Sequence, residues 1–455
     1  MKRSHPAPLA RRLCALAAAA VLAAALTLPA LAAPAASSAA RSDIDPEDTP
    51  AAQTAKTSVT APLALPVALA NEDESVYLYN MDNRTVLLDY NSTESRYVAS
   101  TTKMMTALLL LESGADLYAE FTIADGLAQE FKTIQDYNGA DMGLKTGETV
   151  RLIDLLYGLL VRSANDAASV IAWQLSGGSI QSFVAQMNQR AAELGCTGTT
   201  FSCPHGLYDA GNLSTAQDLA RIAEACYAQP LYMEVAETLS YTLPATNKHK
   251  NERTIENVNL MMLPDQPCYR AYIRGMKTGF TTLAGRCFVT TATQNGATYL
   301  LVVLGSTKDS IYAECAGILD WAFDSFSDRV LLDTAAQVAQ LPLKGCDEAE
   351  TAAVYAARSV AAYGPNTDEV TLELDLPETV RAPVKAGDVI GMAGVYLGGQ
   401  YIDTVDLVAG QDYASAFLSG LWNTVLLAPV LAVVLLALGL FTLRLGGRAP
   451  ARPQR

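Results

Sequence analysis

The sequence predicts an α+β domain, in which one antiparallel sheet is combined with a helical region, followed by a small all-β domain and a C-terminal transmembrane helix. Strand patterns stand at both ends of the first long segment and helical patterns fill its middle, so one sheet should assemble from both ends. Short strand-like runs between Gly, Pro and Asp turns then follow. An uncharged apolar run before a basic tail is long enough to span a bilayer.

The N-terminal segment, residues 1–32, has the order of a secretory signal peptide. A basic stretch precedes an alanine-rich apolar run, and small residues follow at Ala30-Leu31-Ala32. An uncleaved membrane anchor is the alternative interpretation. Residues 33–70 are rich in Ala, Ser, Thr, Pro and acidic residues, so we expect a disordered linker there.

The main domain is predicted over residues 71–328. A hairpin opens it, because the alternating runs 75–80 and 85–89 flank the turn Asp82-Asn83. Helical patterns then cover 103–111, 152–161, 166–175, 180–194 and 215–228. Strands at 286–293 and 298–304 and a helix at 310–326 close the domain.

The second domain is predicted over residues 329–410 as a small all-β unit. Its strand-like runs are 351–355, 370–376, 389–392, 395–397 and 402–408. A transmembrane anchor is predicted at 418–443, and an amphipathic surface helix is disfavoured because the run has no polar face. The tail 444–455 carries four arginines, which places it in the cytoplasm. We therefore expect a single-pass cell-membrane protein with its domains on the extracytoplasmic side.

Charge and cysteine content limit the partners. The net charge of −15 gives no electrostatic support for nucleic-acid binding. Removal of Cys14 with the signal peptide would leave seven cysteines, an odd number, and Cys196 and Cys203 flank a short turn that a disulfide could bridge. No CxxC pair suggests zinc, and no cofactor or metal site is predicted.

Three short motifs occur in order: Ser100-Thr101-Thr102-Lys103, Ser163-Ala164-Asn165 and Lys277-Thr278-Gly279. Residues three apart in a helix share a face, so Lys103 can lie beside the Ser100 hydroxyl. A serine becomes a nucleophile when a base takes its proton, and a lysine can be that base when desolvation or another cation destabilises its ammonium. Lys277 could be that cation, and the Ser100 N–H could form half of an oxyanion hole.

A second KTG, Lys145-Thr146-Gly147, precedes Glu148 and a helical run, so we interpret it as a turn. The motif at 277–279 follows the other two and precedes a strand pair, where an edge strand can bind a peptide.

The three motifs match the set found in penicillin-binding proteins and class A β-lactamases. The surrounding stretches resemble the D-alanyl-D-alanine carboxypeptidase family, peptidase family S11, a group of low-molecular-mass penicillin-binding proteins with a transpeptidase-like fold. The similar stretches are 98–111, 155–168, 204–207, 214–219 and 275–281 with Ala284-Gly285. The resemblance runs from about residue 71 to 326, and a β domain with a terminal anchor fits the family's usual layout.

The resemblance implies a serine hydrolase that removes the terminal D-alanine from peptidoglycan stem peptides ending in D-Ala-D-Ala, through an acyl-enzyme, and that β-lactams acylate. Its implied catalytic residues are Ser100 as nucleophile, Lys103 as base and Ser163 as proton relay. Its implied substrate-binding residues are Asn165 for the substrate amide, Lys277 with Thr278 for the carboxylate, Gly279 of the same motif, and Phe280, whose N–H completes the oxyanion hole.

One departure concerns an arginine that usually follows the second strand in the family and holds the substrate carboxylate. Residues 305–314 contain no arginine, only Lys308, which lacks the bidentate fork of a guanidinium. Arg274 or Lys308 are the candidates to compensate.

Other functions remain as alternatives. The chain could be an inactive or sensing muropeptide-binding module, although intact Ser100 and Lys103 argue against it. A β-lactamase would need a placed glutamate for deacylation, and none is obvious. His205 is interpreted as a turn histidine rather than a base, and two mature histidines support a zinc dipeptidase poorly.

Overall fold

The computed structural model describes residues 56–207, 211–416 and 428–446. The predicted signal peptide, the linker up to residue 55 and the end of the basic tail lie outside these ranges. Residues 56–70, which the sequence assigned to the linker, hold a strand, β1 (Lys56–Thr57), and pack partly buried apolar side chains such as Val67 against the main domain. The folded part therefore begins before the predicted boundary.

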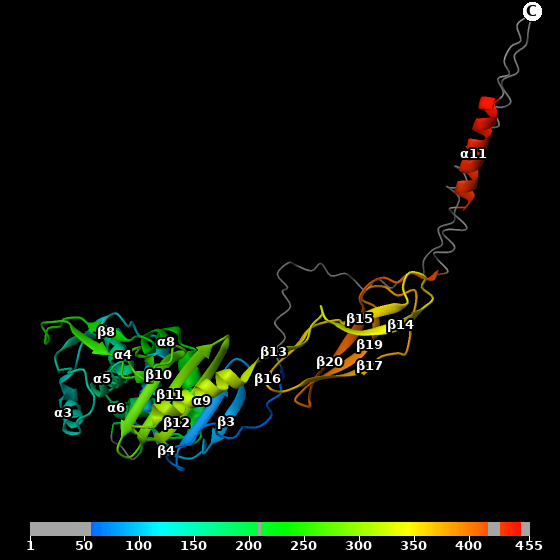
Figure 1. The fold of residues 1–455 in the computed structure, drawn as a ribbon. Coiled ribbons are helices and arrows are strands. Elements are labelled where there is room, and N and C mark those ends of the chain that lie inside the picture. Colours follow the sequence, from blue (N-terminus) through cyan, green and yellow to red (C-terminus); the bar gives the residue numbers. More distant parts are fainter. Residues whose placement is uncertain (1–55, 208–210, 417–427, 447–455) are drawn as a thin grey trace, which may run out of the picture. The chain divides into compact units, whose positions relative to one another are not determined.

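A five-stranded antiparallel sheet forms the centre of the main domain, in the order β10-β11-β12-β2-β3 (Figure 1). Its strands are β2 (Ser75–Asn80), β3 (Thr85–Tyr90), β10 (Ile273–Thr281), β11 (Gly285–Gln294) and β12 (Ala297–Ser306). The first two come from the start of the domain and the last three from its end. The prediction of one antiparallel sheet assembled from both ends is thus confirmed.

The sheet separates two apolar cores because its central strands are buried on both faces. Leu300, Val302 and Leu304 of β12 point into the core shared with the helical region. Leu301 and Val303 point into the core under α9 (Ile311–Ser325), which covers the opposite face. Because successive side chains of a strand point to opposite faces, β12 contributes to both apolar cores.

The helical region matches the predicted helices to within a few residues. It contains α2 (Lys103–Glu112), α3 (Ala128–Asp136), α4 (Leu152–Leu160), α5 (Asn165–Leu175), α6 (Ile180–Glu193), α7 (Ala216–Tyr227) and α8 (Pro230–Ala236). The sequence did not predict α3 or α8. In α3 only Phe131 and Ile134 are buried, so its apolar pattern is short.

Short elements connect these parts. They are β4 (Arg96–Tyr97), β5 (Glu120–Thr122), β6 (Thr149–Arg151), β7 (Leu213–Ser214), β8 (Ser240–Leu243) and β9 (Arg253–Glu256), with 3₁₀ turns η1 (Ala99–Thr102), η2 (Asp125–Leu127) and η3 (Leu260–Met262).

Strand β10 was missed by the sequence analysis, which expected the strand pair to begin at Arg286. Instead the third motif lies inside β10, at the edge of the sheet, and pairs with β11. A register shift precedes it, with Gly275 at φ +92° and Met276 at φ +117°. Such a bulge interrupts the alternation that sequence patterns rely on, and it re-aims the next side chain, here Lys277.

The C-terminal domain is all-β, as predicted. Its strands are β13 (Phe326–Leu332), β14 (Gln337–Lys344), β15 (Thr351–Ala356), β16 (Val360–Pro365), β17 (Val370–Asp375), β18 (Val380–Arg381), β19 (Val389–Leu397) and β20 (Gln400–Ala409). Six of them form one sheet in the order β17-β19-β20-β15-β14-β18. The two runs predicted at 389–392 and 395–397 are one strand, β19.

Beyond this domain the structure describes helix α11 (Ala428–Gly446). Among the described residues, no helix combines the length and apolarity needed to cross a membrane. Part of the predicted anchor, residues 418–427, lies outside the described ranges.

Candidate active site

Ser100 lies in η1, one turn before α2, and the edge strand β10 passes directly over it. A Cβ on Gly279 would stand 3.0 Å from the Ser100 nitrogen and 3.2 Å from the Thr101 nitrogen. Backbone atoms cannot yield easily, so glycine is required for this close approach. Ala99 reaches the turn with φ +45°, a strained conformation of a kind that clusters at functional sites.

Lys103 is completely buried, and its ammonium nitrogen makes three short contacts. Nζ lies 2.8 Å from Ser100 Oγ, 2.7 Å from Asn165 Oδ1 and 2.7 Å from the carbonyl oxygen of His205. The amide and carbonyl oxygens can only accept, so they take two N–H bonds from Nζ. The third contact can then be a bond donated by the Ser100 hydroxyl to the lone pair of a neutral amine. This is the arrangement of a base about to receive the serine proton.

The electrostatics favour the neutral amine. Burial, followed by the nearby charge of Lys277, holds the pKa of Lys103 well below its usual value. Burial also lowers the pKa of Lys277, to about 7. Desolvation and a second cation are the two causes that the sequence analysis required for a lysine base.

Ser163 connects the second motif to the third. Lys277 Nζ donates to Ser163 Oγ over 2.9 Å and to the Thr278 carbonyl over 2.7 Å. Ser163 sits between α4 and α5 with φ +63°, which turns its side chain toward β10. Each motif serine therefore contacts one lysine: Ser100 contacts Lys103, and Ser163 contacts Lys277.

Asn165, the first residue of α5, is 2% exposed and accepts a bond from Lys103. The contact with the substrate amide that the resemblance implies stays a prediction, and the structure shows in addition that Asn165 Oδ1 holds Lys103. Its neighbour Asp166 is also buried and accepts backbone N–H bonds from Met142 and Leu144. These bonds fix the segment before β6 against α5.

Phe280 follows the third motif and is 55% exposed, at the open end of β10. Its register partner on β11 is Arg286. The guanidinium carbon of Arg286 lies 4.7 Å from the centroid of the Phe280 ring, and its Nε is buried without a hydrogen-bond partner in the described part of the chain. A cation thus stands beside the strand of the third motif.

Arg274 and Lys308 are the residues that the sequence offered in place of the missing arginine. Arg274 forms an ion pair with Glu237, with 3.7 Å between Nη1 and Oε2. Lys308 is an exposed residue in the loop after β12. Arg286 was not among the predicted residues because the family's arginine is expected after the second strand of the pair, whereas Arg286 lies at the start of the first, β11.

Three further features of the sequence concern the second KTG motif, the cysteine pair and metal binding. The second KTG forms a turn, with Gly147 at φ +71° and the Glu148 N–H bonded to the Lys145 carbonyl, as predicted. Cys196 and Cys203 are both free, so the disulfide considered from the sequence is absent. In the described ranges, no cluster of His, Cys, Asp or Glu side chains is arranged to hold a metal ion.

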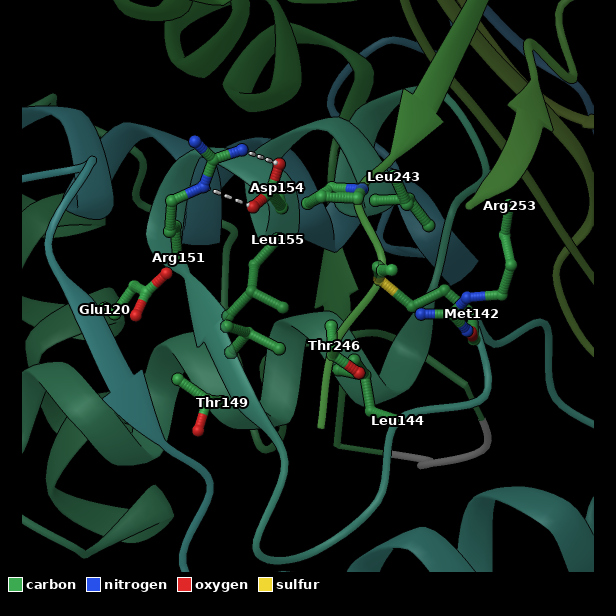
Figure 2. A pocket seen from close by; sticks show the side chains of 13 residues that line it. Glu120, Met142, Leu144, Thr149, Arg151, Asp154, Leu155, Leu243, Thr246 and Arg253 are labelled. Atoms are coloured by element: carbon green, nitrogen blue, oxygen red, sulfur yellow. Dashed lines mark hydrogen bonds and ion pairs between the residues drawn. The ribbon is translucent and has the colours of Figure 1, made fainter. Parts of the chain in front are cut away.

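A hollow on the helical region, shown in Figure 2, contains none of the motif residues. Arg151, Asp154 and Arg253 are among the residues that line it. Its polar groups already pair with each other: both Asp154 oxygens accept from Arg151, and Asp154 Oδ1 also accepts from the Tyr241 hydroxyl. The hollow is therefore separate from the site around Ser100.

Comparisons with known proteins agree with this geometry. The family model for D-alanyl-D-alanine carboxypeptidase matches residues 64–308, and that for the C-terminal domain of penicillin-binding protein 5 matches 347–415. The D-alanyl-D-alanine carboxypeptidase DacF of Bacillus subtilis is 27% identical over 76% of this chain and 87% of its own length. DacC of Escherichia coli is 29% identical over 80% of this chain and 92% of its own length.

A solved structure, penicillin-binding protein 5 from Haemophilus influenzae, has a TM-score of 0.54 at 26% identity and covers 78% of this chain and 100% of that one. The family match spans β2 to β12 and includes every residue of the serine, lysine and glycine arrangement described above. With its motifs brought together by that fold, the chain belongs to the D-alanyl-D-alanine carboxypeptidase family, peptidase family S11.

Proposed function

We propose that this protein is a serine-type D-Ala-D-Ala carboxypeptidase in which Ser100 is the nucleophile and Lys103 the base. The observation that carries the assignment is the contact of 2.8 Å between Ser100 Oγ and a buried lysine whose other bonds go to acceptors. The substrate is a peptidoglycan stem peptide ending in D-Ala-D-Ala, and β-lactams acylate the same serine.

Acylation follows from the positions of these groups. Ser100 Oγ attacks the carbonyl carbon of the terminal peptide bond while Lys103 Nζ takes its proton. The N–H groups of Ser100 and Phe280 stabilise the oxygen that becomes negative. Ser163 relays the proton taken up by Lys103 to the leaving amine of D-alanine, so Lys103 is neutral again, while Lys277 holds Ser163 in place by a bond of 2.9 Å to its Oγ. A water then hydrolyses the acyl-enzyme with Lys103 again acting as base.

The free carboxylate at the substrate's end binds to the cations beside β10. Lys277 and the Thr278 hydroxyl belong to the third motif, and Arg286 adds a guanidinium from the neighbouring strand. A guanidinium can bind a carboxylate through two parallel bonds, which a lysine cannot do. Arg286 thus takes the role of the family's arginine in this chain.

We also propose a membrane tether. Its support lies in the sequence: residues 421–443 are uncharged, and four arginines follow. The catalytic domain would then act on the extracytoplasmic side, where its substrate is found.

The nucleophile is tested by Ser100→Ala. We expect loss of both covalent labelling by a fluorescent penicillin and release of D-alanine from a stem peptide, because Ser100 is the hydroxyl that contacts Lys103 within the described ranges. The control is Ser113→Ala at the other end of α2, whose hydroxyl bonds to the backbone of Leu110 and Ala115 and whose loss should change neither readout. Label without release would indicate a sensing module, and release by Ser100→Ala would exclude this nucleophile.

The base is tested by the pH dependence of acylation. The pKa of Lys103 is lowered, so its base form exists above that pKa, and the acylation rate should fall as the pH drops through it. Lys277→Gln removes the neighbouring charge and raises the pKa of Lys103, so the acid limb should move to higher pH. Exposed Lys308→Gln is the control. An acid limb that stays in place in Lys277→Gln would contradict the coupling.

The carboxylate role of Arg286 is tested with Arg286→Leu. A charge-assisted bidentate bond is worth roughly 1.5–3 kcal/mol, so kcat/KM should fall by about tenfold to a hundredfold, mainly through KM. The same peptide with a C-terminal amide should show no further loss in the variant. Arg274→Leu serves as the matched control, since that guanidinium pairs with Glu237. An equal loss on both peptides would make Arg286 a structural residue.

The tether is tested by fractionation. A chain ending at residue 416 should appear in the soluble extracytoplasmic fraction with its penicillin labelling intact, while the full chain should sediment with membranes. Full-length protein that is recovered in the soluble fraction would refute the anchor.

A further inference from the structure

A thiol, an imidazole and a carboxylate form a hydrogen-bonded series next to the catalytic lysine. Cys203 Sγ lies 3.4 Å from His205 Nδ1, and His205 Nε2 lies 3.1 Å from Glu130 Oε1. Glu130 is held in place by Ser169, whose hydroxyl donates to the same oxygen over 2.9 Å. This is the order of nucleophile, base and orienting acid that activates a nucleophile. The acyl-transfer mechanism uses none of these side chains.

The sulfur is surrounded by hydrogen-bond donors. The Gly206 N–H donates to Sγ over 3.2 Å and Asn212 Nδ2 over 2.8 Å. The Leu207 N–H donates to Nδ1 of His205, 3.0 Å away, so this nitrogen carries a lone pair, and when that lone pair takes the thiol proton the Leu207 N–H loses its acceptor. The two donors then remain to stabilise the thiolate, and Glu130 stabilises the imidazolium.

The pKa shifts of Cys203 and His205 agree with a proton transfer from the thiol to the imidazole. Burial raises the pKa of Cys203, but the His205 contacts and the donated bonds outweigh it and bring the pKa down to about 7. Burial lowers the pKa of His205, and Cys203 and Glu130 outweigh it, which raises the value to about 9. Cys203 is therefore ionised far more readily than an ordinary thiol.

Cys203 also differs from the other described cysteines. All seven described cysteines are free. Four of the others are buried in the core with raised pKa values: Cys196, Cys226, Cys287 and Cys315. Cys203 is partly exposed. An accessible, ionisable thiol is the kind that oxidants select.

The segment that carries this thiol supports the catalytic helix. The His205 carbonyl accepts from Lys103, and the Pro204 carbonyl accepts from the Thr106 hydroxyl over 2.6 Å. Gly206, at φ +68°, packs its α-carbon against the Ala99 carbonyl, where no side chain would fit. An added atom on Sγ has to displace the Gly206 and Asn212 donors, and this moves the backbone that positions Lys103.

We propose that Cys203 is a hydroperoxide-reactive modification site whose oxidation switches off the acyl-transfer site beside it. The thiolate attacks one peroxide oxygen, an S–O bond forms and the O–O bond breaks. Sulfur is oxidised by two electrons to the sulfenic acid, and the leaving hydroxide takes the proton from His205 Nδ1 and departs as water. The switching effect rests on the proposed acyl-transfer function, whereas the reactivity of the thiol does not.

The experiment exposes the full-length protein to hydrogen peroxide and follows two quantities in parallel. Penicillin labelling of Ser100 reports activity, and trapping with dimedone followed by peptide mass analysis reports the oxidised cysteine. We expect labelling to fall in proportion to the dimedone adduct on Cys203. Inactivation should accelerate as the pH rises through about 7, and a thiol reductant should reverse it when dimedone is absent.

Cys203→Ser should label normally and lose activity to peroxide about tenfold more slowly, because Cys203 is the thiol whose oxidation is proposed to disturb the segment that holds Lys103. Cys268→Ser, at a partly exposed cysteine with a raised pKa, should stay as sensitive as the unaltered protein. Glu130→Gln should slow adduct formation while the unoxidised variant still labels.

Dimedone adducts on another cysteine, or an adduct on Cys203 without loss of labelling, would overturn the proposal. If Cys203→Ser does not fold, the proportionality between adduct and lost activity in the unaltered protein decides the question alone. A protein that never reacts with penicillin yet forms the adduct would disprove the acyl-transfer function and the switch, and leave the reactive thiol.

Discussion

The burial of two lysines in one site is the constraint on which the rest of this structure depends. An ammonium without water is expensive unless it is bonded or loses its proton, and two such groups disfavour each other's charge. Lys103 and Lys277 are both nearly free of solvent contact, and each is bonded to a serine of the motifs. Burial and the second lysine therefore keep Lys103 a neutral amine, which can accept the proton of Ser100.

The fold meets this constraint by laying an edge strand over the start of a buried helix. Gly279 allows β10 to approach the Ser100 backbone, and the bulge at Met276 aims Lys277 at Ser163. Ser163 and Ala99 have left-handed backbone conformations that ordinary residues avoid. These two strained residues position the side chains of the site, and the packed apolar cores on both faces of the sheet keep their backbone in this conformation.

Much of this was predictable from the sequence because motif order and helix periodicity are local signals. Ser100 and Lys103 share one turn, and the long apolar helices matched their patterns. Strand β10 was missed since its bulge breaks the alternation, and the contact of Asn165 with Lys103 was not foreseen because it spans 62 positions. Arg286 was not predicted for a similar reason: the role proposed for it rests on its register partner, Phe280, rather than on its neighbours in sequence.

The loop that follows α6 shows how one contact can carry both stability and control. Lys103 needs an acceptor at the His205 carbonyl to remain oriented, so the backbone there cannot move freely. The ring of the same residue lies 3.4 Å from Cys203 Sγ, measured to Nδ1, where the proposed switch has it take the thiol proton. A charge on that sulfur favours the ammonium form of Lys103, since it is a nearby opposite charge. A chemical change at the Cys203 sulfur therefore affects Lys103 in two ways. It disturbs the backbone that positions the amine, and it changes the pKa of the amine.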